Sequence, residues 1–174
     1  MARVLLTGAG SGAAISLMRD LRAGDADLFF VGCSADRFAL TKSPADRNYL
    51  IDSIDHPGYV DSVRRIVIKE RIDLVIPTND DDVRVIARVR DVLPARVFLL
   101  SAETVERCQD KYHLACRLLA QGIPAPRTCP IADLADVERG FEALGGGPLW
   151  CRTRRIVDMN ALRRRSARPW PASP

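Results

Sequence analysis

The sequence predicts an α/β fold, a doubly wound parallel sheet with helices on both faces. Strand-like apolar runs alternate with segments of helical periodicity four or five times within about 100 residues, which requires crossover connections between parallel strands. These runs are continuous rather than alternating, as is typical of strands buried on both sides. The length of 174 residues allows one domain, or one domain and part of a second.

Short apolar runs that end at glycine, proline or polar residues place the strands. Five runs are expected to form the sheet: residues 3–7, 28–33, 48–51, 73–77 and 96–100. Residues 148–152 have the composition of a further strand. The polar residues 34–42 are expected to form a loop between the second and third strands.

Helices are placed by apolar residues three and four positions apart and by residues that favour helix ends. The expected helices cover residues 13–21, 57–71, 80–92, 104–121 and 133–144, the fourth of them in one or two pieces. Pro57 lies in the first turn of the second helix, and Asp133 is placed to cap the last. Residues 122–126 contain two prolines and form a rigid break after the fourth helix.

The composition excludes several classes of protein. Apolar residues make up 47% and charged residues 28%, as in a soluble globular protein, and no apolar run approaches the roughly 20 residues that span a bilayer. The N-terminus turns into a glycine loop too early to hold the apolar region of a signal peptide. We therefore expect a cytoplasmic protein with no membrane partner.

The net charge of +4 is unevenly distributed. Residues 152–174 contain seven arginines and one acid, which gives +6 and leaves −2 for the rest of the chain. The basic character therefore belongs to the tail, and aromatic residues, at 6%, are too few for base stacking. We expect no nucleic-acid partner and a basic, disordered tail at residues 156–174.

Cysteine and histidine usage gives no metal signature. The five cysteines include no Cys-x-x-Cys pair, and the two histidines are far apart in the sequence. The expectation is buried, reduced thiols with neither a zinc site nor a disulfide framework. His56 lies beside Pro57 at a predicted helix start, where a capping role is favoured.

A glycine turn follows the first strand and opens the first helix. Gly8, Gly10, Ser11 and Gly12 form this turn, and Ala13 completes the pattern Gly-x-Gly-x-x-Ala. Free backbone N–H groups and the dipole of the helix suit an anion at such a place. The turn is thus a candidate substrate- or anion-binding loop, although a turn that only packs helix against sheet has the same pattern.

A dinucleotide is the other candidate ligand of this turn. Binding its ribose would need a carboxylate at the end of the second strand, and the nearest, Asp36, lies three residues late. Residues 78–82, Thr-Asn-Asp-Asp-Asp, follow the fourth strand and could hold a cation, but their position at a helix start favours capping. All these loops are expected at the carboxyl edge of the sheet, where small ligands bind in doubly wound folds.

Two later segments carry a family resemblance. Residues 101–111 (SAETVERCQDK) and 122–128 (GIPAPRT) resemble the entry into the ATP-grasp fold, in particular the carbamoyl-phosphate-synthase-like branch of ATP-grasp ligases. Residues 4–12 and 73–78 resemble the Rossmann-like domain that precedes ATP-grasp in that branch. The implied organisation is a Rossmann-like pre-ATP-grasp domain at 1–105, the start of an ATP-grasp lobe at 106–155, and the tail.

The resemblance implies an activity and its cofactors. ATP with Mg²⁺ would phosphorylate a small-molecule carboxylate, and an amine or ammonia would displace the acyl phosphate. Lys111 and Arg152 match the two basic residues that contact ATP phosphates in the family, which suits a reaction catalysed mainly by positioning and charge neutralisation. Without the resemblance, Lys111 would be interpreted as an exposed lysine paired with Asp110.

The chain also departs from the family pattern. No glycine follows Gly147, so the glycine-rich phosphate loop is missing, and the metal-binding carboxylates would lie beyond Pro174. The sequence therefore predicts a truncated or frameshifted fragment with an incomplete ATP-grasp lobe, which binds ATP weakly and is not competent alone. The alternatives are an NAD(P)-binding Rossmann oxidoreductase and a non-catalytic module that binds a small anion or a partner.

Overall fold

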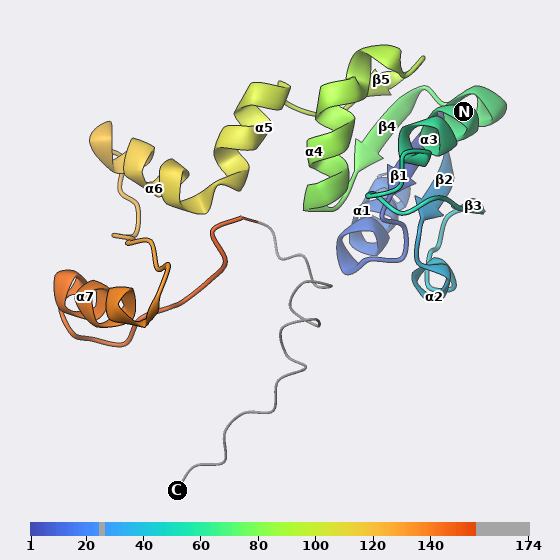
Figure 1. The fold of residues 1–174 in the computed structure, drawn as a ribbon. Helices are drawn as coiled ribbons and strands as arrows, with labels where there is room; N and C mark the ends of the chain where they lie inside the picture. The colour runs from blue at the N-terminus through green and yellow to red at the C-terminus, as the bar shows by residue number, and fades with distance from the viewer. Residues whose placement is uncertain (25–26, 156–174) are drawn as a thin grey trace, which may run out of the picture. The chain divides into compact units, whose positions relative to one another are not determined.

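A computed structural model describes residues 1–24 and 27–155 and contains a parallel five-stranded sheet (Figure 1). The strands are β1 (Ala2–Thr7), β2 (Leu28–Ser34), β3 (Arg47–Leu50), β4 (Leu74–Pro77) and β5 (Arg96–Val97). Their order in the sheet is β3-β2-β1-β4-β5, and each neighbouring pair is parallel. The chain thus winds outward from β1 in both directions, which confirms the predicted doubly wound sheet.

Helices connect these strands and continue beyond the sheet. They are α1 (Gly12–Ala23), α2 (Arg37–Leu40), α3 (Tyr59–Glu70), α4 (Asp80–Val89), the 3₁₀ turn η1 (Arg90–Val92), α5 (Ala102–Gln109), α6 (Lys111–Ala120) and α7 (Leu134–Leu144). The predicted helix at 104–121 is two helices, because Asp110 leaves the helical conformation and caps α6 through its side chain.

Three local expectations need correction. The expected loop at 34–42 contains α2, which begins where the Asp36 side chain accepts N–H groups from Phe38 and Ala39. β5 is shorter than the run at 96–100, and only Arg96 and Val97 pair with β4. The structure assigns no strand at 148–152, where the described residues offer no neighbouring strand for a hydrogen-bond ladder.

Burial on both faces of the sheet explains the continuous apolar strands. Along β1, Val4 and Leu6 pack with Met18 of α1, whereas Leu5 packs on the other face with Val63 of α3. All five side chains are almost or completely buried. The sheet is therefore the middle layer of a helix–sheet–helix arrangement.

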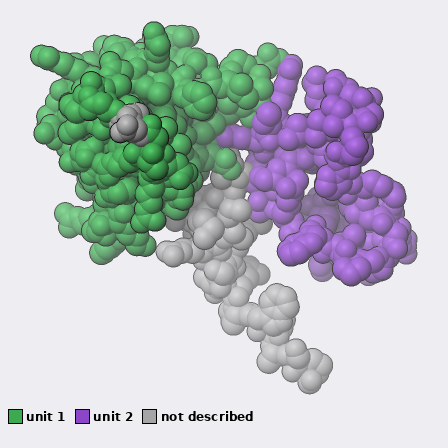
Figure 2. All heavy atoms as spheres, turned by 180° about the vertical axis from the view of Figure 1, so that it is seen from behind, with its two compact units in different colours: residues 1–106 green, residues 107–174 purple. Residues whose placement is uncertain are grey.

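The chain divides into two compact units, residues 1–106 and 107–174 (Figure 2). The first holds the sheet and its helices, and the second holds α6 and α7. The predicted tail at 156–174 lies outside the described residues. None of the helices in the described part of the chain has the length and apolar character needed to cross a membrane.

Candidate functional site

The glycine turn lies at the carboxyl end of β1, in the centre of the sheet. Gly8 and Gly10 have φ angles of 64° and 91°, in the left-handed region that glycine adopts without strain. Ser11 is the N-cap of α1, where its hydroxyl accepts the N–H of Ala14 at 3.2 Å. The amide of Gly12 lies in the first helical turn, which has no helical acceptors of its own.

Residues of neighbouring loops pack closely against this turn. A Cβ on Gly10 would lie 1.9 Å from the carbonyl oxygen of Ala39 in α2, and one on Gly8 would lie 2.6 Å from Nδ2 of Asn79. The hydroxyl of Thr78 donates to the carbonyl of Thr7 at 2.7 Å. The loops after β1, β2 and β4 therefore meet at one edge, as the sequence predicts.

The acidic run after β4 caps and stabilises α4. Asn79 is the N-cap and accepts the N–H of Asp82 at 2.8 Å, and Asp81 pairs with Arg84 at 3.0 Å. Asp82 is only 7% exposed and accepts hydrogen bonds from Tyr59 at 2.5 Å and from Asn79 at 2.7 Å. The capping interpretation is confirmed for Asn79, and no cluster of three metal-ligating side chains occurs within residues 1–24 and 27–155.

The Tyr59–Asp82 pair is part of the buried support beneath this edge. Burial, with the nearby Asp82 carboxylate, raises the pKa of the Tyr59 hydroxyl far above its ordinary value, so Tyr59 remains a donor. Burial and the same carboxylate raise the pKa of the Cys33 thiol. No sequence motif signals this pair, because its residues lie 23 positions apart.

Asp36 Oδ1 accepts the N–H groups of Phe38 and Ala39 at 2.8 and 3.1 Å, so the carboxylate that a dinucleotide would need is engaged as a helix cap. Nδ1 of His56 accepts the N–H of Gly58 at the start of α3. The expectation of buried thiols holds fully for Cys33; three of the other four are exposed, and the last is partly buried.

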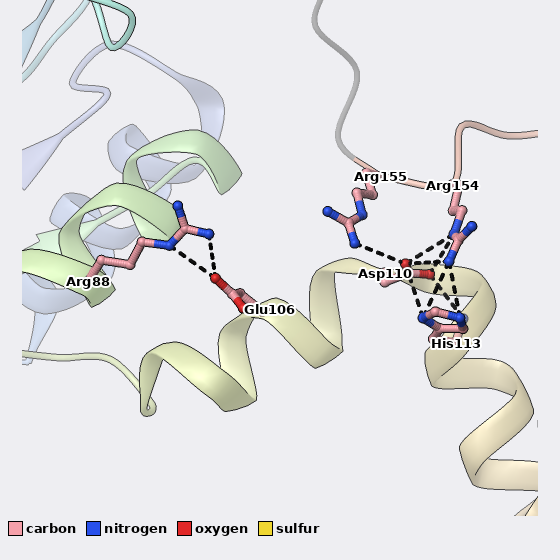
Figure 3. Close-up of polar contacts among 6 residues, drawn as sticks. All are labelled: Arg88, Glu106, Asp110, His113, Arg154 and Arg155. Carbon is pink, nitrogen blue, oxygen red and sulfur yellow. Dashed lines mark hydrogen bonds and ion pairs between the residues drawn. The ribbon is translucent and has the colours of Figure 1, made fainter.

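A second polar site lies at the start of α6, within the second unit (Figure 3). Asp110 is the N-cap, where its Oδ1 accepts the N–H of His113 at 3.0 Å. Lys111 is the first helical residue, and its backbone N–H donates to the carbonyl of Arg154 at 3.0 Å. The backbones of residues 111 and 154 are thus hydrogen-bonded to each other.

The Asp110 carboxylate is the centre of this cluster. Nε of Arg154 lies 3.0 Å from both of its oxygens, and Nη2 of Arg155 lies 3.4 Å from Oδ2. The Arg154 hydrogen bonds outweigh burial and lower the pKa of Asp110 well below its ordinary range, so the carboxylate stays charged. The alternative pairing of Lys111 with Asp110 is not observed among the described ion pairs.

The two residues matched to ATP phosphates keep their charges accessible. Arg152 is exposed, Lys111 is partly buried, and neither forms an ion pair within the described part of the chain. Arg154 and Arg155, which sequence analysis did not single out, are the arginines that pair with Asp110. No sequence motif signals this arrangement, because Asp110 lies 44 positions from Arg154.

A family model described as "PylC-like, N-terminal domain" matches residues 4–95, more than half of the chain. A search of curated proteins found no match. Among solved structures, L-amino acid ligase from Bacillus licheniformis is 16% identical with a TM-score of 0.60, covering 96% of this chain and 42% of that one. N5-carboxyaminoimidazole ribonucleotide synthetase from Thermotoga maritima is 18% identical with a TM-score of 0.58, covering 94% and 43%.

A biotin carboxylase domain of a single-chain bacterial carboxylase is similar to the same extent, with 16% identity and a TM-score of 0.57, covering 95% of this chain and 40% of that one. All three are ATP-grasp enzymes, so the chain has the fold of an ATP-grasp N-terminal region. The chain spans less than half the length of each of them.

Proposed function

Because this chain belongs to the PylC-like N-terminal domain family, we propose that it forms the N-terminal part of an ATP-grasp ligase that joins a carboxylate to an amine or ammonia. The glycine turn at the sheet edge is the observation that carries the proposal. Two left-handed glycines, a capped helix start and a close α2 backbone form one cradle there. Side chains at Gly8 and Gly10 would collide with the side chain of Asn79 and with the backbone of Ala39, so the loops after β2 and β4 pack directly against the cradle.

The ligand assigned to this cradle is the carboxylate substrate. Gly12 and Ala13 offer first-turn N–H groups, and the positive end of the α1 dipole favours an anion. The buried Tyr59–Asp82 pair holds the neighbouring loop in place without offering a positive charge. The site therefore suits a small anion bound mainly by backbone groups.

The nucleotide is assigned to the second unit. Lys111 and Arg152 would contact its phosphates, since both are cations without an ion pair among the described residues and lie near the start of α6. Bound Mg-ATP would supply the phosphoryl group that activates the carboxylate. In finer detail, we propose that the ligase is of the carbamoyl-phosphate-synthase-like type.

Calorimetry of the 174-residue chain with Mg-ATP and with NAD(P) tests this function. We expect Mg-ATP to bind at millimolar affinity or weaker, because the chain spans about two fifths of the related enzymes and polar contacts open to water contribute little. We expect no ATP turnover by this chain alone. Micromolar binding of NAD(P), lost in Asp36→Ala, would favour the oxidoreductase alternative instead.

A further inference from the structure

Asp110 joins two parts of the chain that are more than 40 residues apart. The residue is only 2% exposed, yet its partners Arg154 and Arg155 come from the segment after α7. Four interactions connect the two parts at residue 154. The Arg154 guanidinium pairs with the Asp110 carboxylate, lies 3.1 Å from Nε2 of His113 and lies 5.5 Å from the Tyr112 ring centre, and the Arg154 carbonyl accepts the N–H of Lys111. We call these contacts among Asp110, Lys111 and Arg154 the clasp at the start of α6 (Figure 3).

The arginines of this segment have different roles in the clasp. Arg154 contacts both oxygens of Asp110 through Nε, and its Nη2 lies 2.9 Å from Oδ2, so its charge is neutralised by a buried partner. Arg155 makes one longer contact at 3.4 Å and stays largely exposed. Arg152 is exposed and contacts no carboxylate among the described residues.

We infer that Asp110 and Arg154 are positioning residues, whose ion pair holds residues 152–155 against the start of α6 so that Lys111 and Arg152 can reach the phosphates of one nucleotide. The inference rests on the proposed function for its ligand. The clasp itself stands on the observed contacts alone.

Chain geometry supports the reach that this requires. The backbone of Lys111 touches that of Arg154 through a 3.0 Å hydrogen bond, and Arg152 is two residues away, at most about 7 Å along the chain. Both side chains are long enough to meet over such a separation. Residues 148–155 belong to no helix or strand. Without the clasp, the position of Arg152 relative to Lys111 would therefore depend on a loop.

The chain offers a clean substitution for the test. Asp110→Asn keeps an acceptor for the N–H of His113, and asparagine is as good an N-cap as aspartate, so α6 should remain folded while the charge is lost. Arg154→Gln removes the other partner at a half-exposed position, which provides an independent variant if the first does not fold. The double variant then measures the coupling between the two residues.

The readout is the hydrogen-exchange protection factor of the Lys111 amide, measured by NMR on the full chain. We expect each single variant to lower this protection by about 10-fold or more, since hydrogen bonds to charged groups are worth about that factor or greater. The double variant should lose no more protection of the Lys111 amide than either single variant. Arg154→Lys should keep part of the protection that Arg154→Gln loses. Arg152→Gln, the matched control, should leave the protection unchanged.

Unchanged protection of Lys111 in both Asp110→Asn and Arg154→Gln would overturn the clasp. Mg-ATP titrations of the same variants separate the clasp from the proposed function. If Arg152→Gln weakens Mg-ATP binding and Asp110→Asn does not, positioning by Asp110 is wrong while the nucleotide site stands. If neither Arg152→Gln nor Lys111→Gln changes Mg-ATP binding, the proposed nucleotide site fails, whereas Lys111 protection still decides whether Asp110 anchors the segment.

Discussion

Glu70, at the end of α3, offers the sharpest stability test in the first unit. Its side chain is 2% exposed and accepts hydrogen bonds from Arg3 at 2.6 Å, Arg47 at 2.8 Å and the hydroxyl of Tyr49. Arg3 belongs to β1, and Arg47 and Tyr49 belong to β3. One buried carboxylate thus ties α3 to two strands, and Glu70→Gln keeps its volume while removing its charge.

The expected loss in the free energy of unfolding depends on how much solvation the arginine partners regain. Breaking a fully buried ion pair costs about 3–5 kcal/mol. Arg3 and Arg47 are 25% and 54% exposed, so part of their solvation is regained when the charge is removed. We therefore expect Glu70→Gln to lower the free energy of unfolding by about 2–3 kcal/mol, which corresponds to roughly 10 °C in Tm for a unit of this size.

The pH dependence identifies the cause. Burial opposes ionisation, but hydrogen bonds from Tyr49 and Arg47 outweigh it and lower the pKa of Glu70 from 4.5 to about 2. A carboxyl whose pKa is lower in the folded state stabilises fully above pH 4.5, and this stabilisation is lost as the pH falls toward 2. Chemical denaturation at several pH values, followed by circular dichroism, should show the difference between wild type and variant constant above pH 5 and shrinking below it.

The control is Asp61→Asn, an exposed position in the first turn of the same helix, for which we expect only a few tenths of a kcal/mol. A Glu70→Gln protein as stable as the wild type at pH 7 would refute the reasoning. A difference that persists unchanged to pH 2 would show that the charge is not its source.

Three substitutions and one labelling reaction test the packing at and beneath the glycine turn. Gly10→Ala, with φ at 91° and a new Cβ against the α2 backbone, should lower the unfolding free energy by about 2 kcal/mol or more, whereas Gly12→Ala, in open space at a helix start, should be neutral or slightly stabilising in thermal melts. Asp82→Ala leaves the hydroxyl of Tyr59 without its acceptor and should cost about 2–4 kcal/mol by the same assay; a loss under 1 kcal/mol would contradict its buried role. Iodoacetamide should label exposed Cys151 and spare Cys33, whose burial raises its pKa, as mass spectrometry can check; rapid native labelling of Cys33 would contradict this packing.

The parts of the fold that follow from local sequence were predictable. Continuous apolar runs such as residues 28–33 identified strands buried on both faces, and Gly8 and Gly10 identified a turn with left-handed backbone. Asn79 and Asp133 were recognised as helix caps because capping depends on residues only three positions apart. The family resemblance agreed with these signals and indicated the ATP-grasp fold.

The parts that depend on distant contacts were not predictable. No local pattern pairs Tyr59 with Asp82 or Asp110 with Arg154, since each pair forms only when the chain folds. The short helix α2 was missed because its four residues have too few positions for a periodicity. The alternative interpretation of Lys111, as a partner of Asp110, relied on proximity in the sequence, whereas the arginine partners of the carboxylate come from residues 154 and 155.

The most direct test of the central claim is a two-dimensional ¹H–¹⁵N NMR titration of the 174-residue chain with a pool of L-amino acids as carboxylate probes. We predict saturable shifts of the amide signals of residues 8–13 and 78–82, with little change elsewhere in the first unit. Shifts confined to other residues, or none at concentrations up to tens of millimolar, would contradict a carboxylate site at the glycine turn. Shifts at the turn and at Asp36 on adding NAD(P), with none from the amino acids, would contradict the ligase assignment as well.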